Sequence, residues 1–226
     1  MNDADNAMIT LEKISKIYPG AVPVTALTQI DLVIKPGERL ALLGKSGSGK
    51  STLLNLLALI DKPSGGRLTI DDRAAEDFSE NDATRYRRRD LGFIFQFFNL
   101  LPTLTLRENI CLPMELLGHD DHGLMMELCR EAGICDQLDR YPEEVSGGEQ
   151  QRAAVIRALV KKPRLILADE PTGNLDLDTG LHIVSLMNEI CDRFNTALVM
   201  VTHSREAASV CSRRLKIIDG RLLPDV

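Results

Sequence analysis

The stretch Gly44-Lys45-Ser46-Gly47-Ser48-Gly49-Lys50-Ser51 decides the fold of this 226-residue chain, because it fits the phosphate-binding pattern G-x-x-x-x-G-K-[ST]. Its glycines let the backbone wrap closely around a phosphate chain, since no Cβ blocks the approach. The backbone N–H groups and the N-terminus of a helix that starts near Lys50 then point at the anionic oxygens. The ammonium of Lys50 can reach the β- and γ-phosphates, and the hydroxyl of Ser51 can bind Mg²⁺. A glycine-rich turn that binds nothing is the alternative, and the position of the loop between an apolar strand and a leucine-rich helix argues against it.

Short apolar runs alternate with helical segments along the chain. Continuous apolar strands that are separated by helices favour a largely parallel sheet with both faces covered. We therefore predict an α/β fold, with a mostly helical stretch at residues 103–160 inserted into it. The expected strands are residues 8–17, 24–34, 39–43, 67–70, 91–95, 165–168, 197–201 and 215–218, and the expected helices are residues 50–60, 106–117, 124–132 and 179–194.

The composition argues against several classes of protein. The net charge is −6, from 27 Lys and Arg against 33 Asp and Glu, so a generally basic nucleic-acid-binding protein is not expected. No apolar run reaches the roughly 18 residues that a membrane-spanning helix needs. The polar and acidic first eight residues do not resemble a signal peptide. Five cysteines without a Cys-x-x-Cys pair are expected to be free thiols in a reducing cytosol.

Two carboxylates follow the apolar strand at residues 165–168. Asp169 and Glu170 would emerge at its C-terminal end, where an open α/β sheet places its ligand site. One carboxylate can hold magnesium, and the next can accept a proton from an attacking water. Solvated acids at a strand end are the alternative, and the phosphate loop makes it the weaker one.

A second glycine-rich segment stands at Ser146-Gly147-Gly148-Glu149-Gln150, before a helical run. Ser146 and Glu149 form the pattern of a capping box, so the segment predicts a helix start. Such a start also attracts anions. A second anion site would be redundant in a chain with a complete phosphate loop, unless it serves the nucleotide of another subunit.

These motifs and their order resemble those of the ATP-binding subunits of ABC transporters, over about residues 8–220. The resemblance implies a P-loop NTPase core of the RecA-like type, with a mostly parallel sheet, an N-terminal antiparallel β part and an inserted α-helical subdomain. A single ATPase domain would span residues 1–226. Residues 1–95 and 162–226 would form the nucleotide-binding core, and residues 96–161 the helical subdomain with the signature segment.

The resemblance also implies roles for single residues. Two copies would pack head to tail as a homodimer, so that each ATP lies between the phosphate loop of one and the signature segment of the other. Tyr18 would stack on adenine, and residues 173–176 would cross the dimer interface. Catalysis would depend on Lys50, Gln96, Glu170 and His203. Magnesium would be held by Ser51, Gln96 and Asp169. The nucleotide would be bound by Tyr18, Gly44, Lys45, Ser46, Gly47, Ser48, Gly49, Lys50, Ser51, Thr52, Gln96, Ser146, Gly147, Gly148, Glu149 and His203.

Glu149 and the pair Gly173-Asn174 resemble the branch that contains lipoprotein-release, macrolide-export and cell-division ATPases. We therefore expect a peripheral ATPase subunit at the cytoplasmic face of the inner (plasma) membrane. It would drive export or extraction of a lipoprotein, drug or peptide through integral membrane permease subunits, and would meet the membrane only through them. A cell-division-type ATPase that gates a membrane partner without transport is the alternative. An ATPase of DNA repair or translation is disfavoured, because the chain has neither room for a long coiled coil between residues 51 and 146 nor a second cassette.

Three further features have two interpretations each. Phe97 and Phe98 either pack in the core or line an exposed groove for a short helix of a membrane subunit. The basic residues around Tyr86, at positions 85–89, are expected to form a solvated face, with lipid head groups or an acidic loop as the alternative partner. Residues 119–122 are expected to be a polar loop rather than a metal site.

Overall fold

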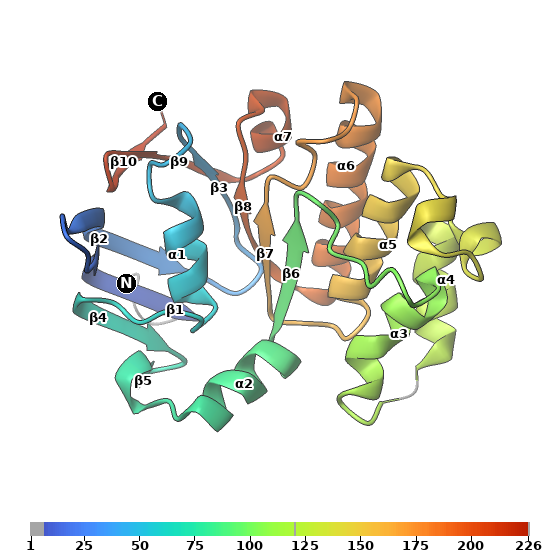
Figure 1. Cartoon of the computed structure of the whole chain (residues 1–226), viewed down its shortest axis with the longest axis horizontal. Helices are drawn as coiled ribbons and strands as arrows, with labels where there is room; N and C mark the ends of the chain where they lie inside the picture. Colours follow the sequence, from blue (N-terminus) through green and yellow to red (C-terminus); the bar gives the residue numbers. More distant parts are fainter. Residues whose placement is uncertain (1–6, 120, 226) are drawn as a thin grey trace.

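The computed structural model of the chain describes residues 7–119 and 121–225, and these residues form two β-sheets (Figure 1). The first sheet is antiparallel, with the order β2-β1-β4-β5. It consists of β1 (Ile9–Tyr18), β2 (Val24–Ile34), β4 (Gly65–Ile70) and β5 (Arg73–Ala74). The second sheet has the order β10-β9-β3-β8-β7-β6, in which β9 and β10 pair antiparallel and the other neighbours pair parallel. It consists of β3 (Arg39–Leu43), β6 (Leu91–Phe95), β7 (Leu165–Asp169), β8 (Ala197–Val201), β9 (Arg213–Ile218) and β10 (Arg221–Pro224). The predicted α/β fold is confirmed, with its mostly parallel sheet and its N-terminal antiparallel part.

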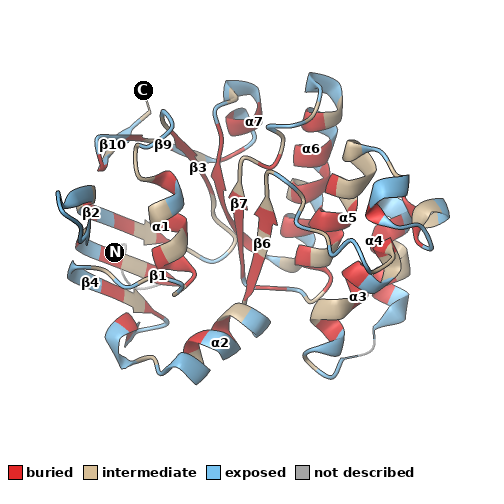
Figure 2. Ribbon diagram, viewed as in Figure 1, coloured by how far each residue is buried: buried red, intermediate tan, exposed pale blue. Residues whose placement is uncertain are grey.

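The parallel strands are buried on both faces, as Figure 2 shows for β6 and β7. Side chains alternate along each strand between two hydrophobic clusters, because successive residues of a strand point to opposite faces. In β3, Leu40 and Leu42 belong to one cluster, whereas Ala41 and Leu43 belong to the other. Burial on both sides explains why these strands are continuously apolar in the sequence.

Helix α1 (Lys50–Leu57) lies between the two sheets, directly after the phosphate loop (Figure 1). Its buried leucines, among them Leu53, Leu56 and Leu57, share a cluster with Ile14 of β1 and Val199 of β8. Each fully buried leucine contributes about 1.5–3 kcal/mol relative to an exposed one. The loop is therefore held between two packed layers by the helix that it begins.

The opposite face of the parallel sheet is covered by α5 (Gly147–Leu159) and α6 (Leu177–Phe194), and α3 (Leu106–Glu115) and α4 (His122–Glu131) pack outside them (Figure 1). One cluster unites all of these helices with the sheet; for example, Ile110, Leu128 and Ile156 join Leu198 of β8. The boundaries of a separate helical subdomain at residues 96–161 stay a prediction.

Some elements differ from the sequence prediction. Helix α1 ends at Leu57 rather than at residue 60, because Leu59 takes a left-handed conformation with φ 51°. Helix α2 (Glu80–Arg89) was not expected, since it buries only Ala83 and Tyr86 on an otherwise polar surface. A capping box between Ser79 and Asp82 starts it. The short helix α7 (Arg205–Ser209) and strand β10 were also not expected.

All five cysteines are thiols rather than halves of disulfides, as expected. Within residues 7–119 and 121–225, none of the helices has both the length and the apolar character needed to cross a bilayer.

Candidate nucleotide site

The carboxyl ends of four parallel strands meet at one edge of the second sheet, and each is followed by a predicted site residue. The phosphate loop follows β3, Gln96 follows β6, Glu170 follows Asp169 at the end of β7, and His203 lies two residues beyond β8. Parallel pairing brings these ends together because the strands run in one direction. This is the edge at which open α/β sheets bind ligands.

The phosphate loop is shaped by backbone that an ordinary residue would not adopt. Gly49 has φ 108°, and a Cβ there would collide with the carbonyl oxygen of Ala26. Inside the loop, the Nζ of Lys50 donates to the carbonyl oxygens of Gly44 at 2.7 Å and Lys45 at 2.8 Å. The buried hydroxyl of Ser48 has no hydrogen-bond partner among residues 7–119 and 121–225. Such a group calls for a ligand, because a buried polar atom is costly when it is left unpaired.

Lys50 is buried, with 6% of its surface exposed. This burial lowers the pKa of its ammonium, and the charges of Glu170 and Asp169 act in the opposite direction. The positive charge therefore lies in a dehydrated loop beside two carboxylates. A phosphate chain entering the loop would give this ammonium a compensating partner.

Two hollows flank the loop. The larger, about 620 Å³, is lined by residues 44–48, His203 and residues 216–219 at the end of β9. The smaller, about 230 Å³, is lined by Glu170, by residues 24–26 of β2 and by the remaining loop residues, among them Lys50, Ser51 and Thr52. Of the predicted catalytic residues, Lys50, Glu170 and His203 line these hollows and Gln96 does not.

Two of the three residues predicted to hold magnesium, Ser51 and Asp169, contact each other, whereas the side chain of Gln96 is bonded to Asn174. The hydroxyl of Ser51 donates to Oδ2 of Asp169 at 3.1 Å, so a hydroxyl and a carboxylate oxygen face the same point. Mg²⁺ prefers such oxygen ligands and keeps several waters, so two protein ligands fit it. Among the described residues, no group of three or more His, Cys, Asp or Glu side chains is arranged to hold a metal. Residues 119–122 were predicted to form a polar loop; Asp121 instead caps α4 and His122 begins it, and residue 120 lies outside the described residues.

Glu170 and His203 form a direct pair. Nε2 of His203 lies 2.7 Å from Oε1 of Glu170, and the side chains are 48% and 23% exposed respectively. Glu170 has φ 48°, an unusual left-handed conformation for a side chain of this size, and its N–H donates to the carbonyl oxygen of Val201 in β8. Strained backbone of this kind gathers at functional sites. The carboxylate contacts His203, and Glu170 lines the smaller hollow.

Gln96 is joined to Asn174, which the sequence analysis placed only in a predicted interface segment. Nδ2 of Asn174 donates to the carbonyl oxygen of Gln96 at 2.9 Å, and Nε2 of Gln96 donates to Oδ1 of Asn174 at 3.5 Å. Gly173 makes room for this contact, since a Cβ there would lie 2.9 Å from Nε2 of Gln96. Two hydrogen bonds therefore join the end of β6 to the segment after Glu170.

The signature segment begins α5, as expected. Ser146 caps the helix: its N–H and its hydroxyl both donate to Oε2 of Glu149, at 2.8 and 2.7 Å. The hydroxyl of Ser146 in particular lowers the pKa of Glu149. A Cβ on Gly147 would lie 3.5 Å from the ring of Phe98, and one on Gly148 would lie 3.0 Å from Thr179. None of the residues Ser146, Gly147, Gly148 and Glu149 lines either hollow beside the phosphate loop. The structure thus brings together the strand-end residues but not the signature residues of the same chain.

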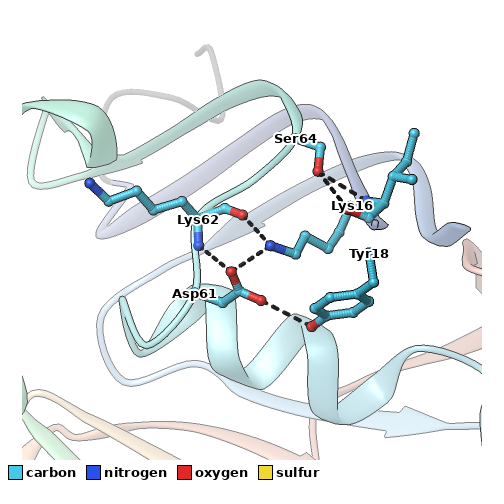
Figure 3. A network of polar contacts seen from close by, with 6 residues as sticks. Lys16, Tyr18, Asp61, Lys62 and Ser64 are labelled. Carbon is cyan, nitrogen blue, oxygen red and sulfur yellow. Dashed lines mark hydrogen bonds and ion pairs between the residues drawn. The ribbon is translucent and has the colours of Figure 1, made fainter. Parts of the chain in front are cut away.

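Tyr18 also lies apart from the two hollows. It ends β1, with 36% of its surface exposed, and its hydroxyl donates to Oδ2 of Asp61 at 3.0 Å (Figure 3). Asp61 follows α1 and also accepts bonds from the ammonium of Lys16 and the N–H of Lys62. Partial burial acts to raise the pKa of the Asp61 carboxyl, but these hydrogen bonds outweigh it and lower the pKa.

One further residue was not recognised from the sequence. Gln151, directly after the signature segment, is fully buried and donates to the carbonyl oxygen of Pro171 at 2.6 Å. It ties the signature helix to the segment after Glu170. The sequence offered no signal for this contact, because a glutamine in the first turns of a helix is ordinarily exposed.

Comparisons with known proteins agree with this geometry. A family model described as "ABC transporter" matches residues 27–173. The lipoprotein-releasing system ATP-binding protein LolD of Shewanella frigidimarina is 39% identical, covering 98% of this chain and 95% of the relative. An uncharacterized ABC transporter ATP-binding protein of Mycobacterium tuberculosis is 45% identical, covering 88% of this chain and 82% of the relative.

A solved dimer of the ATP-binding cassette MJ0796, in a post-hydrolysis state with bound ADP and Pi, superposes with a TM-score of 0.87. It is 36% identical and covers 95% of this chain and 96% of the other. A family model that matches most of the chain, close relatives along its length and a shared fold lead to one conclusion. This chain belongs to the ABC transporter family and is one of its ATP-binding, ATP-hydrolysing proteins.

Proposed function

We propose that the chain is the ATPase subunit of a transporter that releases lipoproteins from a membrane, and that it works as a head-to-tail homodimer with Mg²⁺ and ATP. One observation supports the dimer most strongly: the strand-end residues gather around the phosphate loop, whereas the signature segment lies outside both hollows of its own chain. Its helix start, with Ser146 and two glycines, would then serve the ATP of a second copy.

The residues around the loop have complementary tasks in hydrolysis. When ATP binds, the ammonium of Lys50 leaves the carbonyl oxygens of Gly44 and Lys45 and contacts the β- and γ-phosphates. The phosphate oxygens are the stronger acceptors because they carry negative charge. Glu170 accepts the proton of the attacking water, and His203 orients Glu170 through their 2.7 Å contact and reaches the γ-phosphate. Gln96, held by Asn174, positions the water.

Ser51 and Asp169 would hold Mg²⁺, whose charge neutralises the phosphate oxygens when it is bound with the nucleotide. The main-chain N–H groups of the loop bind the same oxygens from the other side. Little covalent chemistry is left for the protein, so positioning and charge provide most of the rate.

The proposed cargo rests on the relatives. LolD of Shewanella frigidimarina and LolD of Psychrobacter arcticus, both named for a lipoprotein-releasing system, match this chain at 39% and 41% identity over nearly all of its length. The chain would act at the cytoplasmic face of the inner membrane through permease subunits. Phe97, 71% exposed, and Leu101, 44% exposed, follow Gln96 and offer an apolar surface for such a partner.

The test is to purify the chain from detergent-solubilised membranes of its own host and to reconstitute the complex in vesicles that carry a lipoprotein. We expect integral membrane subunits to co-purify, and lipoprotein to leave the vesicles only when ATP is hydrolysed. A complex that hydrolyses ATP and keeps the lipoprotein in the vesicle would contradict the cargo. It would favour a drug or peptide exporter, or a regulatory ATPase that gates its partner.

A further inference from the structure

The end of β1 is fastened to the segment after α1 by a network of polar contacts, which Figure 3 shows from close by. The N–H of Ile17 donates to the hydroxyl of Ser64 at 3.0 Å, and this hydroxyl donates back to the carbonyl oxygen of Ile17 at 3.2 Å. The ammonium of Lys16 donates to the carbonyl oxygen of Lys62 at 2.9 Å and forms an ion pair with Asp61. The backbone that carries Tyr18 is therefore fixed.

Asp61 is the centre of this network. Its Oδ1 accepts the Lys16 ammonium and the N–H of Lys62, and its Oδ2 accepts the hydroxyl of Tyr18 at 3.0 Å. The Lys16 side chain is only 11% exposed, and that of Asp61 is 26% exposed. Both carboxylate oxygens of Asp61 therefore accept hydrogen bonds within the network. The bond from the Tyr18 hydroxyl tethers the ring of Tyr18.

The ring of Tyr18 is covered on one side. The Lys16 ammonium lies 4.8 Å from the centroid of the ring, within reach of a cation–π contact, while 36% of the tyrosine surface stays exposed. The tyrosine stands in an otherwise open surface, because its neighbours in the hairpin, Ile17 and Val24, are 44% and 60% exposed. Without the hydroxyl contact, little on this surface would hold the ring in one rotamer.

We propose that Asp61, together with Lys16, is a positioning residue that presets the Tyr18 ring as a stacking platform for the adenine base. This inference rests on the proposed function, since it takes ATP as the ligand, and on the role expected for Tyr18 as the base contact. Tyr18 pairs with Val24 of β2, which lines the smaller hollow beside the phosphate loop. A flexible aromatic side chain loses rotamer freedom when it stacks on a ligand, and a tethered one has already lost it. The tether therefore strengthens the binding of the base and leaves the phosphate contacts unchanged.

The test compares ATP with inorganic tripolyphosphate, which has the phosphate chain but no base. Binding of each to the full-length protein is measured by calorimetry, and KM and kcat of ATP hydrolysis are measured in parallel. The variants are Asp61→Ala, which removes the tether, and Tyr18→Phe, which removes only the hydroxyl and keeps the ring. Asp139→Ala is the matched control, because Asp139 pairs with Arg107 on the surface and its side chain is 84% exposed.

We expect Asp61→Ala and Tyr18→Phe each to weaken ATP binding about threefold to tenfold, as the loss of a preset side chain predicts. Tripolyphosphate binding should be unchanged, and KM should rise while kcat at saturating ATP stays the same. The double variant should be no weaker than Asp61→Ala alone, because both changes break the same hydrogen bond. Asp139→Ala should behave as the native protein for both ligands.

Two further variants separate this inference from the function on which it rests. Tyr18→Ala should lose ATP affinity but not tripolyphosphate affinity; if it loses neither, the base does not stack on Tyr18 and the inference falls with it. If Tyr18→Ala responds but Asp61→Ala and Tyr18→Phe bind ATP normally, the tether is irrelevant and stacking stands. If Asp61→Ala loses equal affinity for ATP and for tripolyphosphate, Asp61 acts through α1 on the phosphate loop, which overturns the inference.

Lys50→Ala should lower the affinity for both ligands. If it lowers neither, the result counts against the nucleotide site itself.

Discussion

At the scale of single residues, hydrolysis in our proposal depends on the contact between Glu170 and His203. The carboxylate is held by strained backbone at φ 48° and by an N–H bond to Val201, so its direction is set before any ligand arrives. The imidazole Nε2 lies 2.7 Å from it. A base positioned in this way accelerates hydrolysis by accepting a proton from the attacking water in the transition state.

The variant Glu170→Gln keeps the shape of the side chain and removes its basicity. We expect the rate of phosphate release to fall by about 10²–10⁴, the usual contribution of a general base, while ATP affinity is retained. Single-turnover phosphate release and ATP binding measure the two quantities. Glu127→Gln is the matched control, because Glu127 pairs with Arg193 on the surface. Hydrolysis at the native rate in Glu170→Gln would show that another group accepts the proton.

At the scale of elements, α5 connects the signature segment to the loop that follows β6. Arg157 on α5 donates to the carbonyl oxygens of Phe98 at 2.8 Å and of Asn99. Both residues have left-handed backbone, with φ 60° and 50°. Burial lowers the pKa of Arg157, so the guanidinium is desolvated and its two carbonyl partners matter. One side chain thus holds the loop that carries the exposed Phe97.

We expect Arg157→Ala to lower the free energy of unfolding by about 2 kcal/mol, because two hydrogen bonds from a charged donor are lost and the carbonyl oxygens of Phe98 and Asn99 lose that partner. Urea unfolding measures the change. Arg85→Ala on α2, where the side chain is 75% exposed, should stay within about 0.5 kcal/mol of the native value. Equal stability of the two variants would show that Arg157 does not hold the loop.

A contact between the end of α5 and helix α2 makes the free energy of unfolding depend on pH in the alkaline range. Lys161 donates to the carbonyl oxygens of Arg87 and Arg88, and burial lowers its pKa to about 8. The unfolded chain keeps this proton up to about pH 10.4. Between these values the unfolded state binds more protons than the folded state, so the Lys161 contribution to stability rises with pH.

Compared with Lys161→Met, the native chain should therefore gain up to about 2 kcal/mol of stability as the pH rises from 8 to 10. Below pH 8 the difference between the two proteins should be constant. Urea unfolding at a series of pH values measures it. Lys162→Met is the control, since Lys162 is 52% exposed, and its difference from the native chain should show no such rise. If the difference in free energy of unfolding between the native protein and Lys161→Met does not change between pH 8 and 10, the lowered pKa of Lys161 is contradicted.

What the sequence could predict at this scale depended on local signals. Strands β3, β6, β7 and β8 are short apolar runs, and the phosphate loop is a contiguous pattern, so both could be located from composition and spacing. Helix α2 was missed because two buried residues in ten give no apolar stripe. The contact of Tyr18 with Asp61 joins residues 43 positions apart, and that of Gln96 with Asn174 joins residues 78 positions apart. Contacts of this kind follow from strand register and loop conformation, which a single sequence does not specify.

At the scale of the whole molecule, the phosphate loop and the signature segment of one chain lie apart. One edge of the parallel sheet carries the phosphate loop, Asp169, Glu170 and His203, and the signature segment lies outside the hollows at that edge. A symmetric dimer would bring the signature segment of each copy to the phosphate loop of the other. Gly147 is a suitable position for testing this, because the atoms nearest to a Cβ there are those of Phe98 at 3.5 Å and Leu175 at 4.0 Å, which is ordinary van der Waals contact.

Mixing two inactive variants tests this arrangement most directly. Lys50→Ala has a defective phosphate loop and an intact signature segment, and Gly147→Glu has the reverse. Each alone should hydrolyse no ATP. If the two segments of different copies form one site, every mixed dimer contains one complete site, and an equal mixture should recover about a quarter of the native rate, given random pairing in a symmetric dimer. A mixture that forms mixed dimers and stays as inactive as its components would contradict the shared site.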